Sequence, residues 1–460
     1  MHRPAAFVLL LSPLGLLSCA AEWSKPEAPA LPASLPAKSE PLAKWWTQLG
    51  SPQLDALVEE AMAKNLDVAI ALTKIAEDGG AIDAIVAASL PSLDAGGGVT
   101  RKQRSANVNG ADQGPPISNT WNAALKFSYE TDVSALNLRS RKAMAHDLLR
   151  ADTYLAAATR AALSGRVVRA VFAAGAARKQ CEQLRLAIAS YDESLKIRQR
   201  QLDIGAASPL ELQRIEAEAA RLRSSLPALE QAGEQALHLL AFLLGRDLGD
   251  TRLAEQVAAI DFERISSPLP PPELAADLLQ RRPDVLAAEA QLDLAANEVN
   301  AVRSRYYPRI SLLGGIGFEA DRSGRLFDSD SKTWSGGIGV SQALLGLFAV
   351  AADEDRAIAR RERGALLYRQ TAFRAWQEAR SSLSACTAGS RRVSALQERV
   401  AALRAQLASL EKRRDLGAAG SLEVRVAERE LIDAEINLVQ ARTDAAISRS
   451  EAILALGGAW

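Results

Sequence analysis

The chain has 460 residues, with 55 Lys and Arg against 55 Asp and Glu, so its formal net charge is zero. This balance creates no field that would favour nucleic acid or an anionic membrane surface as a partner. Only three cysteines occur, and Cys181 and Cys386 have no partner at close spacing, which argues against a disulfide framework or a cysteine metal site. The abundance of Ala, Leu, Glu, Arg and Gln is typical of long helices.

The first 18 residues have the pattern of an export signal, with a short apolar stretch over residues 5–17. The ending Leu-Leu-Ser-Cys resembles the bacterial lipobox, in which the cysteine, here Cys19, becomes the lipid-modified first residue of the mature protein. Ala20 follows, as in lipoproteins sent to the outer membrane. Residues 19–44 contain five prolines, so we expect a lipid-bearing extended tether. The alternative is an ordinary signal peptide with an incidental cysteine.

Two segments of the chain repeat each other without a gap. Residues 203–218 and 415–430 are identical at eight of sixteen positions. A repeat distance of about 215 residues is far too long for a solenoid unit. We therefore predict one structural module that has been duplicated and fused, with a first repeat over residues 45–265 and a second over residues 266–460.

Each repeat contains a very long helical pattern without proline, over about residues 135–201 and 349–414. A helix of roughly 65 residues would be about 100 Å long, which exceeds the needs of a globular domain. Each pattern ends at a Gly-Ala-Ala turn, and a second helix returns to about residue 244 or 456. We predict two long antiparallel helical hairpins with Gly205 and Gly417 at their tips. Apolar residues at seven-residue spacing indicate coiled-coil packing: Ile188, Leu195 and Leu202, then Leu396, Leu403 and Leu410.

No segment beyond the tether has 18 consecutive apolar residues, so any further membrane insertion must use strands. Four strands are predicted, over residues 92–103, 120–131, 309–320 and 333–342. An open strand edge in lipid is costly and a single-chain barrel needs about eight strands, so four strands cannot close alone. Three copies would supply about twelve. The alternative at this point is a soluble protein with two small hairpins packed on its helices.

Several segments carry a family resemblance. The run LLQRRPDVLAAEAQLDLAANEV from Leu278 to Val299, the run YYPRISLLGGIG from Tyr306 to Gly317 and the terminal LALGGAW resemble the TolC-like outer membrane factors. The similarity is strongest to the OprM and NodT lipoprotein branch of RND-type multidrug efflux systems. It implies a mainly helical homotrimer with a twelve-stranded outer membrane barrel and a periplasmic barrel of helices. It also implies a periplasmic membrane-fusion adaptor and an inner-membrane RND-type pump as partners.

The same resemblance places the two tip turns at the periplasmic end of the tunnel, where carboxylates form rings. Glu211 and Glu423 occupy the corresponding positions. Six acids around one axis would raise the local cation concentration and oppose their own simultaneous ionisation. The alternative role is a solvated acid that the helix dipole favours in a first turn. Two departures from the family pattern lie nearby: Val426 replaces a second acid, and Arg414 replaces an aromatic residue.

An enzymatic function finds no support in the sequence. The histidines, His2, His146 and His238, lack metalloprotease spacing, and no nucleophile-elbow, Walker or dinucleotide motif is present. We therefore expect no catalytic residue, no metal site and no cofactor apart from the lipid on Cys19. The predicted function is an outer membrane exit duct for small toxic compounds. A polypeptide exit channel of type I secretion and a periplasmic helical scaffold without a pore are the alternatives.

Overall fold

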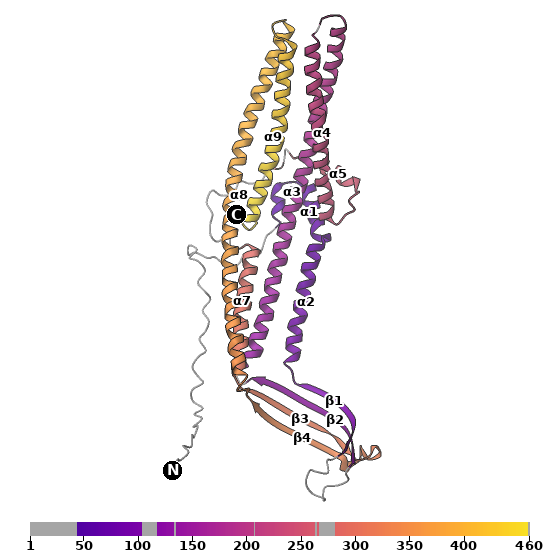
Figure 1. The fold of residues 1–460 in the computed structure, drawn as a ribbon, viewed down its shortest axis with the longest axis vertical. Coiled ribbons are helices and arrows are strands. Elements are labelled where there is room, and N and C mark those ends of the chain that lie inside the picture. Colours follow the sequence, from indigo (N-terminus) through magenta and orange to yellow (C-terminus); the bar gives the residue numbers. More distant parts are fainter. Residues whose placement is uncertain are drawn as a thin grey trace, which may run out of the picture.

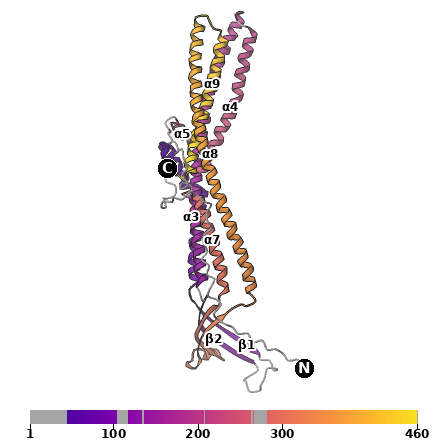
Figure 2. The ribbon, with the colours of Figure 1, turned by 90° about the vertical axis from the view of Figure 1, so that its left-hand side faces the viewer.

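The computed structural model describes residues 44–103, 117–132, 135–206, 208–262, 265 and 281–458. The molecule is a long bundle of helices with a four-stranded sheet at one end (Figure 1). A view turned by 90° shows the same order, with the hairpin tips and the sheet at opposite ends (Figure 2). This arrangement confirms the predicted combination of long helical hairpins and strands.

The helices occupy most of the described chain. In order they are η1 (Trp45–Leu49), α1 (Pro52–Lys64), α2 (Leu66–Ala88), α3 (Leu136–Asp203), α4 (Pro209–Leu244), α5 (Thr251–Ala258), α7 (Pro283–Arg303), η2 (Ser304–Tyr306), α8 (Leu347–Asp415) and α9 (Ser421–Ala455). Helices α3 and α8 have 68 and 69 residues, so each is about 100 Å long. Within the described residues, none of the helices is both long and apolar enough to cross a bilayer.

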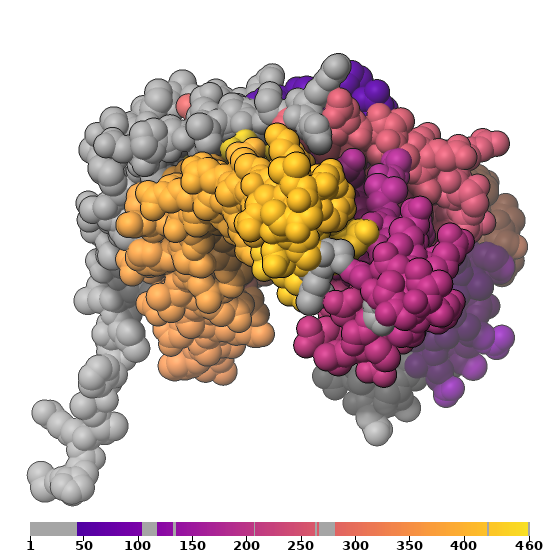
Figure 3. All heavy atoms as spheres, turned by 90° about the horizontal axis from the view of Figure 1, so that it is seen from above, coloured from indigo at the N-terminus to yellow at the C-terminus, as the bar shows by residue number. Residues whose placement is uncertain are grey.

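Two helical hairpins extend away from the sheet, α3 with α4 and α8 with α9, and their tips stand apart when viewed from above (Figure 3). Residues at the predicted seven-residue spacing pack between the helices. Ile188 and Leu195 join a cluster with buried Leu222, and Leu396 and Leu403 pack around buried Val400. Apolar contacts between paired helices therefore hold each hairpin together.

The four strands form one antiparallel sheet in the order β1-β2-β3-β4. Their bounds are β1 (Ser92–Gln103), β2 (Ile117–Asp132), β3 (Arg309–Ala320) and β4 (Lys332–Ser341). Strand β2 begins three residues earlier than predicted, because Ile117 pairs with Gln103 and extends the ladder to the end of β1. Two further 3-10 turns lie between β3 and β4, at Ser323–Arg325 and Ser329–Ser331.

The two faces of this sheet differ in chemistry. The register places Leu125 opposite Ile316 and Ile316 opposite Trp334, so large apolar side chains share one face. Trp334 is 84% exposed and Ile338 is 78% exposed. The other face contains polar and small residues: Asp94, Lys126, Glu130, Arg309, Ser335 and several glycines. An exposed apolar face backed by a polar face is typical of strands that separate lipid from water.

The main hydrophobic core lies at mid-height, where α1, α4 and α5 pack on α3. Trp45 is buried here, and its indole N–H donates to Ser164 Oγ at 2.8 Å. Asn65 joins two elements, because its side chain caps α2 by accepting from the Asp67 amide and donates to the Leu243 carbonyl at 3.0 Å. These contacts fix the start of the described chain to the base of the first hairpin.

Candidate functional site

The two tips have the same backbone geometry. Gly205 and Gly417 both have φ +73°, a left-handed conformation that glycine adopts without steric cost. In the first tip Gly205 N–H donates to Leu202 O at 2.9 Å, and the next amide donates to Gln201 O at 2.7 Å. The second tip repeats this pair of bonds at the same lengths, from Gly417 and the residue after it. Both turns are Schellman motifs, which end a helix by satisfying its last carbonyls.

The two candidate pore acids differ in their surroundings. Glu211 lies in the first turn of α4, and its carboxylate is 3.3 Å from Arg198 Nη1 on α3. Glu423 lies in the first turn of α9 and is exposed. Among the described residues, Glu423 has no ion-pair partner. Glu211 therefore has an ion-pair partner within its own hairpin, whereas Glu423 faces solvent without one among the described residues.

Position along the hairpin explains this difference. Arg198 stands seven residues before Gly205 and Glu211 six residues after it, so the turn brings them face to face. In the repeat, the residue at the position of Arg198 is Leu410. Arg414, which replaces an aromatic residue of the family pattern, pairs with its neighbour Asp415 at 2.9 Å and does not substitute for Arg198.

Below the tips, a polar network joins the two hairpins. Glu218 on α4 lies 3.8 Å from Arg429 on α9, and Arg221 on α4 lies 3.7 Å from Asp433 on α9. These distances are long for ion pairs, so each contact is weak. We call these four residues the inter-hairpin pairs. These pairs could not be predicted from the sequence, because the partners lie more than 200 residues apart and the rotation of each helix about its axis decides whether their side chains meet.

The hydroxyl of Tyr191 also links the two hairpins. Tyr191 on α3 is buried, and its hydroxyl donates to the carbonyl oxygen of Arg425 on α9 at 3.4 Å. Burial raises the pKa of Tyr191 to about 12, so the hydroxyl keeps its proton. Ile432 and Ile436 of α9 pack against the cluster that contains Tyr191. The second hairpin is thus held to the first by apolar contact and by few polar bonds.

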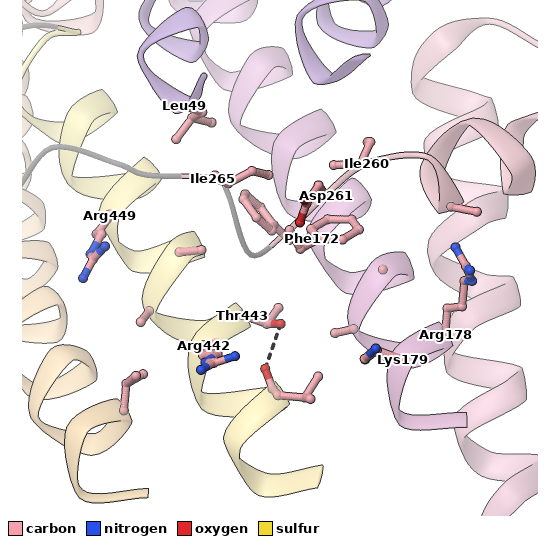
Figure 4. A pocket seen from close by; sticks show the side chains of 18 of the residues that line it. Leu49, Phe172, Arg178, Lys179, Ile260, Asp261, Ile265, Arg442, Thr443 and Arg449 are labelled. Atoms are coloured by element: carbon pink, nitrogen blue, oxygen red, sulfur yellow. Dashed lines mark hydrogen bonds between the residues drawn. The ribbon is translucent and has the colours of Figure 1, made fainter. Parts of the chain in front are cut away.

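A groove separates the hairpins nearer to the middle of the molecule. It has a volume of about 610 Å³, with apolar side chains such as Phe172 and Ile265 at one end and Lys179 and Arg442 at the other (Figure 4). Gln180 of α3 donates to Gln440 of α9 at 3.1 Å close to it. The groove leaves space between α3 and α9 below the inter-hairpin pairs.

The RRPD run noted in the sequence forms a buried clamp. Arg282 is only 11% exposed; its guanidinium donates to Asp284 at 2.6 Å and Glu378 at 2.7 Å, and reaches the carbonyl of Ala455 at 3.3 Å. Burial lowers the pKa of this guanidinium, but the bonds to both carboxylates outweigh burial and raise it. The motif therefore joins the start of α7 to α8 and to the end of α9.

Cys19, the predicted lipidation site, lies outside the described residues, and so do residues 20–43 of the predicted tether. The described part places Gly205 and Gly417 in the tip turns and both candidate acids one turn beyond them. Long helical hairpins joined to strands with one apolar and one polar face define the class of outer membrane channel subunits.

The comparisons with known proteins agree with this class. The family described as outer membrane efflux protein matches residues 57–246 and 274–458. The chain is 27% identical over 427 residues to the pyoverdine export outer membrane protein OpmQ of Pseudomonas aeruginosa, covering 91% of this chain and 88% of that protein. It is 24% identical to the probable outer membrane lipoprotein SilC of Salmonella typhimurium, covering 97% and 96%. The crystal structure of the CmeC outer membrane channel of Campylobacter jejuni matches with a TM-score of 0.81 at 20% identity, covering 94% and 95%.

This chain belongs to the outer membrane efflux protein family. It is therefore an outer membrane efflux protein, which agrees with the exit duct that the sequence predicted. The family is one of transport proteins, which agrees with the absence of catalytic motifs in the sequence. The likeness to CmeC shows the fold.

Proposed function

We propose that three copies of this chain assemble into one gated channel. The observation that supports this most strongly is the open sheet, whose edge strands are β1 and β4. Unpaired backbone groups in lipid cost several kcal/mol each, so the edges need partners. Pairing β4 of one copy with β1 of the next would give twelve strands, with the apolar face toward lipid and the polar face around water.

The helices next to these edges support the same assembly. Helix α2 leads into β1, and α8 follows β4, so both border the open sides of the subunit (Figure 1). Both expose large apolar residues. On α2, Leu66 is 73% and Ile70 is 68% exposed; on α8, Leu366 is 64% and Phe373 is 63% exposed. Contact between α8 and α2 of neighbouring copies would bury these side chains, at about 25 cal/mol per Å² of apolar surface.

The tips are the proposed gate. A periplasmic membrane-fusion adaptor would bind the tip turns at Gly205 and Gly417, and the weak inter-hairpin pairs would let the second hairpin move away from the first. Glu423 would lie at the constriction in three copies and favour cations. Glu211 would contribute less charge, because Arg198 is 3.3 Å away. An RND-type inner-membrane pump would select the cargo.

Small toxic compounds are the proposed cargo, in preference to an exported polypeptide. Two relatives at 25% identity are named as outer membrane proteins of an antibiotic efflux pump and of a toluene efflux pump. The RRPD run and the lipobox also resemble the drug-efflux branch.

A lipid on Cys19 is the proposed anchor in the outer membrane, with the helical barrel in the periplasm. From Cys19 to Lys44 the chain advances by 25 residues. At about 3.1 Å per residue an extended tether spans roughly 75 Å. Helix α2, with 23 residues, covers about 35 Å of the distance between the start of the described chain and β1. The tether is therefore long enough for its lipid to reach the membrane.

Cysteine crosslinking tests the assembly. Gly96 on β1 and Gly337 on β4 lie on the polar face, and a Cβ at either position meets no atom within 4 Å. We expect Gly96→Cys combined with Gly337→Cys, or with Thr333→Cys in a second register, to give covalent trimers on oxidation of the membrane-extracted protein. Each single variant serves as the control and should give none. A monomer by native mass, with neither pair crosslinking, would contradict the trimer and favour the scaffold alternative.

A further inference from the structure

A cavity of about 310 Å³ lies where the sheet joins the helices. Its walls come from the end of α2, the end of β2, the first turns of α3, and the segment from η2 to the start of β3. Three arginines line it, Arg141, Arg305 and Arg309, together with Tyr129 and Glu130. No other described cavity touches the sheet.

The charges around this cavity favour an anion. Arg309 pairs with Glu130 at 3.0 Å, and Arg305 pairs with Asp353 at 2.6 Å. Arg141 is exposed, and among the described residues it has no ion-pair partner. When Asp353 is counted beside Glu130, three guanidinium groups face two carboxylates, which leaves the charge of Arg141 uncompensated. The N-terminal end of α3, which also lines the cavity, adds the positive end of a helix dipole.

The position of the cavity, at the end of the apolar face of the sheet, suggests the identity of the anion. Tyr129 lies on the apolar face of the sheet, opposite Leu312, near its helical end. In the strand register, the backbone of Arg309 lies opposite Asp132 on β2 and Ser341 on β4, at the end of the sheet nearest the helices. The apolar face therefore ends at this level, where aromatic and arginine side chains typically meet lipid headgroups.

We propose that this cavity binds a phosphate group, with Arg141 as the principal donor, and that the phosphate belongs to an anionic phospholipid of the surrounding leaflet. A guanidinium binds phosphate through two parallel N–H donors, so Arg141 can bind it in bidentate fashion while the guanidinium of Arg305 adds charge. Free phosphate is the other source of the same chemistry. The proposal depends on the sheet lying in the outer membrane, but not on the adaptor or the gate.

Lipid retention measured by native mass spectrometry tests the site. Purified full-length protein is exchanged into mixed micelles of phosphatidylglycerol and phosphatidylcholine at equal amounts. We expect wild-type protein to retain phosphatidylglycerol preferentially. Arg141→Ala should reduce that preference about tenfold. Arg141→Lys should reduce it about threefold, because lysine keeps the positive charge but lacks the two parallel N–H donors of a guanidinium. Arg391→Ala, which removes an exposed arginine of α8 far from the sheet, is the matched control and should retain lipid like the wild type.

Further measurements identify the source of the phosphate and control for misfolded variants. Titration with inorganic phosphate should compete weakly for a lipid site; strong Arg141-dependent binding of inorganic phosphate, without preference for phosphatidylglycerol, would overturn the lipid assignment. Arg305→Gln is a second variant and should reduce retention by a smaller factor. Single-channel conductance of the same samples should stay unchanged, which separates this site from the channel itself. Equal retention by wild type, Arg141→Ala and Arg305→Gln would overturn the proposal.

Discussion

The two hairpin tips share one backbone design and differ in their electrostatics. Both end in a Schellman motif with a glycine at φ +73°, and both place a glutamate in the first turn of the returning helix. Only the first tip contains the partner Arg198, since Leu410 stands at the same position of the repeat. Duplication has thus preserved the reversal of the chain, while the charge at the two tips has diverged.

The largest expected effect tests the shared backbone. Gly205→Val and Gly417→Val should each lower the local free energy of unfolding by about 2 kcal/mol, because a β-branched residue is strained at positive φ. Both changes should have equal effects, since the backbone geometry is the same. Hydrogen exchange of the tip peptides measures them. Gly79→Ala in α2 is the control and should stabilise its helix slightly; clearly unequal losses at the tips would refute the equivalence.

A second effect, on the order of 1–2 kcal/mol after allowance for solvent screening of a partly exposed group, concerns the titration of a carboxyl group away from the tips. Burial and a hydrogen bond to Asp78 raise the pKa of Asp152, between α2 and α3, from 3.8 to about 6. The folded state then holds a proton that the unfolded state has released, so stability falls as pH rises from about 4 to about 6. Thermal unfolding measured across this range should show that loss, and Asp152→Asn should remove it. A slope that persists in the variant would assign the titration to another group.

A third test exchanges the electrostatics of the two tips. Arg198→Leu should make the first tip resemble the second and raise the ratio of cation to anion permeability about twofold, because Glu211 loses its counter-charge. Leu410→Arg should lower the ratio by a similar factor by giving Glu423 a partner. Reversal potentials in a salt gradient measure both. If the exchange has no effect in either direction, the tip acids do not face the pore.

The smallest effect concerns the inter-hairpin pairs. Glu218→Gln and Asp433→Asn should each weaken the contact between hairpins by about 0.5 kcal/mol, because partly exposed pairs at 3.7 to 3.8 Å contribute little. The expected result is a longer open time of single channels, with non-additive effects in the double variant, because Glu218 and Asp433 share Arg221 as an ion-pair partner. Glu398→Gln on α8, an exposed acid without an ion pair among the described residues, is the matched control.

Much of the architecture followed from periodicity and duplication. The long helices end within three residues of the predicted limits, and two strands, β1 and β3, have the predicted bounds. These features depend on local patterns: proline-free helical stretches, period-two alternation and glycine at the turns. The positions of Gly205 and Gly417 in the tips followed from the same signals.

The side-chain contacts within and between the hairpins were not predicted from the sequence. Arg198 and Glu211 could have been paired by counting outward from Gly205, since residues equally distant from a hairpin turn face each other. No such count relates Glu218 to Arg429 or Asp78 to Asp152, because the rotation of separate helices decides those contacts. The RRPD run was conspicuous in the sequence, yet burial of Arg282 between two carboxylates emerged only from packing.

The most direct test of a gated trimeric duct is the conductance of the purified, detergent-extracted protein in a planar bilayer, with its oligomeric mass determined on the same sample. We predict a trimer with a small, cation-preferring and mostly closed conductance, whose cation preference falls in Glu423→Gln and changes less in Glu211→Gln. A monomer without channel activity, with its helices intact, would contradict the account.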